Sequence, residues 1–180
     1  MKEEKCTLTV WDYIVSGDML YVQTTITDYN SDVKYQEADT IFAYDMSTKE
    51  EKEITAIDET KQMLQMRMAK DGILYYTVQN KWDSEKDILS MTQEEQKEYW
   101  KEEEKKTHIE VYRADYFEGT VELVKEVDNG FVVAVNDDIG VYYYEFAGDG
   151  LANGIKLYHW NPEEEKEEVV LDREGKSPLQ

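Results

Sequence analysis

The feature that most constrains the fold is a strand–turn–strand pattern that occurs three times along the chain. Its clearest copy spans Thr40–Thr55, where an apolar stretch ends at Tyr44-Asp45 and a polar turn leads into a second strand. Similar hairpins occur at 108–124 and 154–171. A pattern repeated at long intervals predicts a repeat architecture, in which each copy buries its apolar face against its neighbours.

Two further strands are predicted before each hairpin, because runs rich in β-branched and aromatic residues flank short Asp/Gly or Asn/Asp turns. These strand pairs cover 7–15 and 19–27, 63–69 and 73–78, and 130–135 and 140–146. The chain is therefore predicted to be all-β, a single domain over 1–180 with units at about 7–56, 60–127 and 130–171 and a tail at 172–180. Each unit is predicted to be a four-stranded antiparallel sheet.

One segment departs from the β pattern and predicts a helical insertion near 91–106. Thr92 is a helix cap, and Glu95 three residues later completes a capping box. The segment lies between the second and third strands of the second unit. We therefore expect the helix to interrupt the repeat without replacing a strand.

The charge of the chain restricts its partners. Of its 180 residues, 41 are acidic and 20 are basic, which gives a net charge of −21 spread along the sequence. Such a surface repels nucleic acid and anionic membrane surfaces, because binding there requires cations that displace counterions. We expect no nucleic-acid binding, and no run approaches the ~20 apolar residues of a membrane span.

The single cysteine, Cys6, excludes an internal disulfide and leaves the compartment unknown. The charged residues before it do not form a signal peptide, and they differ from those that precede a lipidated cysteine. We expect any export signal to lie outside this chain.

The repeat resembles the blades of β-propellers of the TolB-like and YncE-like kind over most of residues 7–171 outside the helix. The resemblance is carried by the Asp/Gly turn before a Leu-Tyr strand and by Tyr44-Asp45-Met46-Ser47-Thr48 with the charged residues that follow. At the Tyr-Asp position the second unit is read as Tyr112-Arg113 and the third as Tyr158-His159. The resemblance implies propeller-type blades and favours an extracytoplasmic protein, such as a surface protein or lipoprotein.

Three blades are fewer than the ~4–8 that close a propeller. The chain is therefore predicted to be an open arc or part of a larger propeller. Its exposed strand edges would be covered by missing blades or by self-association.

One loop fits part of a calcium-binding pattern. Asp28, Asn30 and Asp32 occupy alternate positions, and Asp39 is the twelfth residue counted from Asp28. Val33 stands where such loops have glycine, and a polar inter-strand loop is the competing interpretation. Calcium is the one cofactor that the sequence suggests.

The two histidines, His108 and His159, lie in corresponding hairpins without nearby cysteine or a His-x-x-x-His spacing. Satisfied or exposed side chains are therefore the favoured interpretation over metal ligands. No Gly-x-Ser-x-Gly motif occurs. Carboxylates are too numerous for any one pair to indicate a glycosidase.

Aromatic side chains near loops suggest a ligand platform made of Tyr13, Tyr29, Trp82 and Tyr143. The competing interpretation makes the tyrosines core residues that pack between sheets. These core tyrosines are predicted at positions 21, 44, 75, 112, 142 and 158.

These observations predict a non-catalytic binding or scaffold module for a protein, peptide or glycan. One alternative is an accessory propeller fragment of a larger hydrolase. Another is an extracytoplasmic sensor or structural arm.

Overall fold

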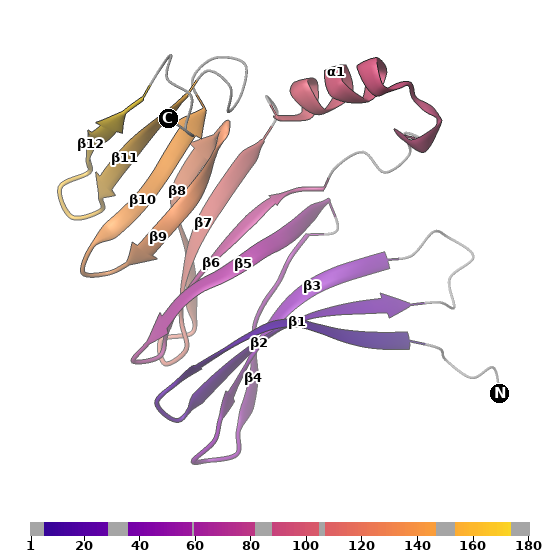
Figure 1. The fold of residues 1–180 in the computed structure, drawn as a ribbon. Helices are drawn as coiled ribbons and strands as arrows, with labels where there is room; N and C mark the ends of the chain where they lie inside the picture. The colour runs from indigo at the N-terminus through magenta and orange to yellow at the C-terminus, as the bar shows by residue number, and fades with distance from the viewer. Residues whose placement is uncertain are drawn as a thin grey trace. The chain divides into compact units, whose positions relative to one another are not determined.

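The computed structural model describes residues 6–28, 36–58, 60–81, 88–104, 107–146 and 154–173. Its strands form three four-stranded antiparallel sheets, each in the order of the sequence (Figure 1). The all-β prediction with three four-stranded units and one helical insertion is confirmed. Within these residues, no helix is long and apolar enough to cross a membrane.

The chain divides into two compact units. The first comprises residues 1–78 with 112–123, and the second comprises 79–111 with 124–180.

The first sheet consists of β1 (Cys6–Ser16), β2 (Met19–Asp28), β3 (Gln36–Asp45) and β4 (Glu51–Ala56). Ile14, Tyr21 and Ala43 lie side by side on adjacent strands. Tyr21 and Ala43 are fully buried in the core of the first unit, which also contains Met63 and Leu74 of the second sheet. This face of the first sheet therefore packs against the second sheet.

The second sheet consists of β5 (Lys61–Lys70), β6 (Ile73–Asn80), β7 (His108–Asp115) and β8 (Thr120–Asp128). Asp71 and Gly72 both have positive φ, 52° and 84°, which suits the two-residue turn between β5 and β6. A Cβ on Gly72 would lie 2.3 Å from the Phe117 ring. The positive φ therefore favours glycine at this position, and any larger residue would have to displace the exposed Phe117 ring.

The helical insertion lies between β6 and β7, as predicted. It consists of a short 3-10 helix, η1 (Ile88–Ser90), and α1 (Gln93–Glu104). The Thr92 N–H donates to Glu95 Oε2 (2.8 Å) and the Glu95 N–H donates to Thr92 Oγ1 (3.3 Å). This reciprocal pair is the predicted capping box.

The third sheet consists of β9 (Gly130–Asn136), β10 (Gly140–Phe146), β11 (Ile155–Asn161) and β12 (Lys166–Asp172). Phe131, Tyr144, Leu157 and Leu171 form one row across all four strands. Tyr143 belongs to the next row and points to the opposite face, because side chains alternate along a strand.

The turn between the third and fourth strands is built in the same way in all three sheets. Asp45, Asp115 and Asn161 each end the third strand and accept the backbone N–H groups two and three residues later. Four residues after each acceptor, the backbone has positive φ, at Lys49, Gly119 and Glu165. The three hairpins thus have the same turn structure although their residues differ.

This shared turn corrects the predicted alignment of the repeats. The residues equivalent to Tyr44-Asp45 are Ala114-Asp115 and Trp160-Asn161, two positions after the predicted Tyr112-Arg113 and Tyr158-His159. The side-chain acceptor fixes the turn, so it determines the register of the repeat more strongly than the preceding aromatic residue.

Candidate functional site

A histidine and three carboxylates gather where β7 begins and β8 ends. His108 and Glu110 are two residues apart on β7, and Glu126 and Asp128 are two residues apart on β8. Each pair therefore projects from one face of its strand. The Asn129 N–H donates to the Thr107 carbonyl (2.8 Å), and antiparallel counting from this bond places His108 opposite Asp128 and Glu110 opposite Glu126.

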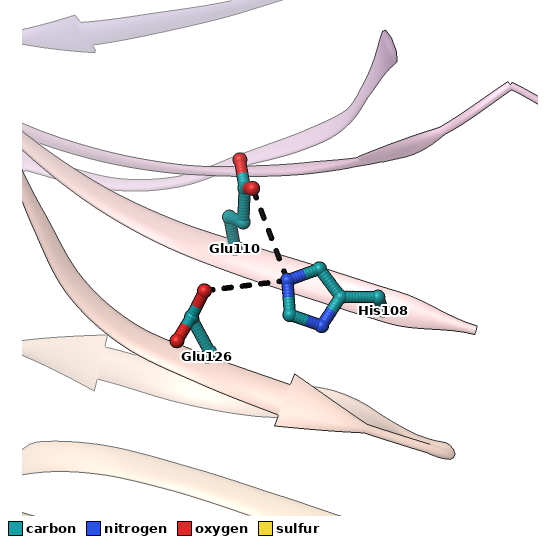
Figure 2. Close-up of side chains that lie close together, drawn as sticks. All are labelled: His108, Glu110 and Glu126. Carbon is teal, nitrogen blue, oxygen red and sulfur yellow. Dashed lines mark ion pairs between the residues drawn. The ribbon is translucent and has the colours of Figure 1, made fainter. Parts of the chain in front are cut away.

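Two carboxylates approach the same imidazole nitrogen (Figure 2). His108 Nε2 lies 3.4 Å from Glu126 Oε1 and 3.8 Å from Glu110 Oε1. The other ring nitrogen, Nδ1, lies 2.7 Å from Asp128 Oδ1. Because a carboxylate only accepts, Nδ1 donates its hydrogen to Asp128.

These contacts raise the pKa of His108. The hydrogen bond to Asp128 is the largest cause, partial burial of the ring opposes it, and the charges of Asp128, Glu126 and Glu110 add to the increase. Glu110 is 9% exposed, whereas the Glu126 side chain is 57% exposed. The cluster thus combines a buried carboxylate, an accessible carboxylate and an oriented imidazole.

The arrangement allows two kinds of chemistry. A protonated His108 forms an ion-pair network with its three carboxylate neighbours. With Nε2 deprotonated, the ligand atoms of His108, Glu110 and Glu126 lie within 4.8 Å of one another and can hold a metal ion. Satisfied or exposed histidines were predicted, and His108 is satisfied, but the three carboxylates around it were not predicted. The signal for this group was the pair of patterns His-x-Glu and Glu-x-Asp on two strands of one hairpin.

A second polar network lies on one face of the third sheet. The Tyr143 hydroxyl donates to Glu167 Oε2, and Lys125 Nζ donates to the same oxygen (2.9 Å). Lys125 also lies over the Tyr143 ring, 5.2 Å from its centroid, and Tyr143 stacks on Tyr158. Burial alone would raise the pKa of Glu167, but the hydrogen bonds from Tyr143 and Lys125 and the charge of Lys125 lower it below its usual value. The network thus pairs the Glu167 carboxylate, whose side chain is 38% exposed, with one lysine.

An apolar row lines the face of the first sheet opposite the core. Leu8, Val10, Tyr13 and Val15 on β1 are each between 55% and 66% exposed. They share this face because a β-bulge at Trp11 shifts the alternation between Val10 and Asp12. We call these four residues the β1 apolar row.

The next strands continue this surface. Tyr13 lies beside Val22, which pairs with Phe42, and Val15 lies beside Leu20. Trp11 instead donates its Nε1–H to Thr25 Oγ1 (2.6 Å) on the other face. Apolar side chains on three strands therefore share this face, and exposed apolar groups that lie together mark interaction sites in other proteins.

The predicted calcium loop falls mostly outside the described residues, since these exclude Asn30, Asp32 and the side chain of Asp28. Asp39 is described. Its Oδ1 accepts the Thr25 hydroxyl (2.5 Å), and its Oδ2 accepts the Met63 N–H (2.7 Å). One carboxylate oxygen thus binds a neighbouring strand of the first sheet, and the other holds β5 of the second sheet against it.

The predicted aromatic platform is divided by the structure. Tyr13 is exposed as part of the β1 apolar row, while Tyr29 and Trp82 lie outside the described residues. Tyr143 is 2% exposed and bonded to Glu167, so it offers no face to a ligand from solvent. The predicted core tyrosines are buried at 21 and 75 and half-buried at 44, 112, 142 and 158.

His159 is held within its own sheet. Its Nε2 donates to the Ile139 carbonyl (2.8 Å), its Nδ1 lies 3.4 Å from Glu168 Oε1, and its ring stacks on Tyr142. A hollow of about 450 Å³ lined by Asp137, Asp138 and Glu163 adjoins this ring. The side chain is thus satisfied within the third sheet.

No protein-family model matches the chain, and no curated protein matches it. The resemblance to TolB-like and YncE-like blades stays a prediction.

Proposed function

We propose that the chain is a non-catalytic binding and scaffold module that associates through the outer faces of its sheets. The observation that carries this proposal is the β1 apolar row, four large side chains on one strand that are each more than half exposed. A soluble protein rarely leaves such a row in water unless a partner covers it. The partner that we propose is a second copy of this chain.

The chain already buries sheet faces by stacking them. In the first unit, Tyr21 and Ile41 of the first sheet pack with Met66 and Tyr76 of the second. Burial of this kind contributes about 25 cal/mol for each Å² of apolar surface. A further sheet on the β1 apolar row would repeat the same packing.

A second copy supplies a suitable sheet face. On the third sheet, the row of Phe131, Tyr144, Leu157 and Leu171 lies on the face opposite Tyr143, and Phe131 and Leu171 are 39% and 41% exposed. Contact between two different faces is heterologous, so it builds rings or open chains of copies. A propeller-like ring is one such product.

The net charge makes this association depend on salt. Two chains of charge −21 repel one another, and dissolved salt screens that repulsion over about 8 Å at physiological ionic strength. Apolar contact is not weakened by screening. Association is therefore expected to strengthen as salt is added.

Sedimentation velocity over a concentration series tests the proposal. The wild-type chain is expected to form oligomers, whereas Tyr13→Ser/Val15→Ser and Phe131→Ser/Leu171→Ser are each expected to sediment as smaller species. A mixture of the two variants retains one intact pair of faces and is expected to form only heterodimers. Leu89→Ser is the control, since this residue is 94% exposed on η1.

A wild-type chain that stays monomeric at high concentration and high salt would contradict the second copy as partner. Equal oligomerisation of the wild type and both double variants would contradict the assigned faces. Circular dichroism of each variant separates a lost contact from a lost fold.

A further inference from the structure

The cluster at the start of β7 provides a site that the proposed association does not use. We propose that His108, Glu110 and Glu126 bind one divalent transition-metal ion, with zinc the preferred ion. Asp128 is the positioning residue that orients the imidazole.

The spacing of the ligand atoms suits tetrahedral coordination. Metal–ligand bonds of about 2.0–2.1 Å place neighbouring ligands about 3.3 Å apart around a tetrahedral zinc ion. The Nε2–Oε1 distances are 3.4 Å to Glu126 and 3.8 Å to Glu110. The Glu126 distance already matches this spacing, and a small shift of the imidazole toward Glu110 completes the geometry.

Asp128 prepares His108 for this role. By accepting the hydrogen on Nδ1, it leaves the lone pair of Nε2 directed at the two glutamates. A carboxylate behind a ligating histidine fixes the tautomer and makes the imidazole more basic, as in many zinc sites. The ligand nitrogen and the glutamates therefore face one another before the ion arrives.

Glu110 is the less accessible of the two glutamate ligands. Its residue is 9% exposed, and a buried carboxylate is costly unless a positive charge or hydrogen bonds compensate it. A divalent ion bound here adds positive charge beside this carboxylate.

The donor set selects the class of ion. One imidazole nitrogen with two carboxylate oxygens suits zinc and its neighbours in the first transition series, whereas calcium and magnesium prefer oxygen ligands throughout. Three protein ligands leave the fourth tetrahedral position to water. The chain is therefore expected to select zinc over calcium at this site.

Isothermal titration calorimetry with zinc chloride on the full chain, stripped of metal by a chelator, tests the site. Millimolar magnesium is kept present to occupy diffuse carboxylates on this acidic surface. We expect one zinc ion per chain. His108→Gln and Glu126→Gln are each expected to weaken binding at least tenfold, and Asp128→Asn on the order of 10–100-fold.

Glu168→Gln is the matched control, because it removes a carboxylate beside the other histidine, whose Nε2 is already bonded to Ile139. It is expected to leave zinc affinity unchanged. Equal zinc affinity in the wild type, His108→Gln and Glu126→Gln would overturn the proposal, as would displacement of zinc by equimolar calcium. Glu126 is exposed, so Glu126→Gln is expected to fold normally. The test therefore does not depend on a substitution of the buried Glu110.

Discussion

The Tyr143 hydroxyl donates to the Glu167 carboxylate across the third sheet, which joins β10 to β12 although β11 lies between them. Tyr143→Phe removes this bond and is expected to lower the free energy of unfolding by about 1 kcal/mol, because Glu167 keeps Lys125 and partial access to water. Urea denaturation checks the value. In a double-mutant cycle with Glu167→Gln, additive effects would show that the bond contributes nothing.

Two substitutions of Tyr21 should distinguish the stability contributed by its buried ring from that contributed by its hydroxyl. Its ring is fully buried, and within the described residues its hydroxyl has no hydrogen-bond partner. Tyr21→Ala should therefore cost about 3–5 kcal/mol, whereas Tyr21→Phe should leave stability unchanged or increase it. Thermal unfolding of both variants measures this. Destabilisation by Tyr21→Phe equal to that of Tyr21→Ala would show that the hydroxyl is satisfied.

The same residue should resist ionisation. Burial, followed by the charge of Asp115, raises the pKa of Tyr21 to about 12. Ultraviolet difference spectra of wild type and Tyr21→Phe are therefore expected to diverge only near that pH. Divergence near pH 10 would place the hydroxyl in contact with water.

The turn at Asp45 should respond to acid, and the equivalent turn at Asn161 should not. Hydrogen bonds from the Ser47 hydroxyl and from the backbone of Thr48 and Ser47 lower the pKa of Asp45. A lowered pKa stabilises the folded chain above the ordinary value of about 3.9, and this contribution is lost as the pH falls through the folded value.

Carbon NMR of the Asp45 carboxyl group measures its midpoint, which Ser47→Ala should raise. Asp45→Asn should keep the turn and remove its pH dependence, because an amide oxygen accepts the same two N–H groups at Asn161. An Asp45 midpoint at the ordinary value would contradict this account.

In metal-free protein, the stability that His108 contributes should change with pH in the opposite direction to that of Asp45. Its raised pKa means that the charged imidazole stabilises the fold below the ordinary value of about 6.5, and that this stabilisation is lost as the pH rises through the folded value. Proton NMR in a chelator measures the midpoint. Asp128→Asn should lower it, since Asp128 is the largest cause, whereas Glu168→Gln should not.

The strands and the helix could be predicted from the sequence because their signals are local. Thr92 and Glu95 form a cap within one turn, and Asp71-Gly72 forms a hairpin within two residues. The pattern of periodic apolar residues and turn formers therefore predicted the position of each strand and of the helical insertion.

Features that depend on register between strands could not be predicted. Which of the adjacent tyrosines Tyr142, Tyr143 and Tyr144 points to the Lys125 side depends on pairing with β9, whose bulge shifts the alternation. The bulge at Trp11 likewise decides that the β1 apolar row shares one face. The metal ligands of His108 are brought together only when β7 pairs with β8.

The three equivalent turns have a consequence for recognising related chains. What they share is a side-chain acceptor followed four residues later by a left-handed backbone, at Asp45 and Lys49, Asp115 and Gly119, and Asn161 and Glu165. Only one of the three left-handed residues is glycine, and only one acceptor follows a tyrosine. A profile that scores residue identity will pass over most such units, whereas one that scores an Asp or Asn and the backbone conformation four positions later will find distant copies of this hairpin.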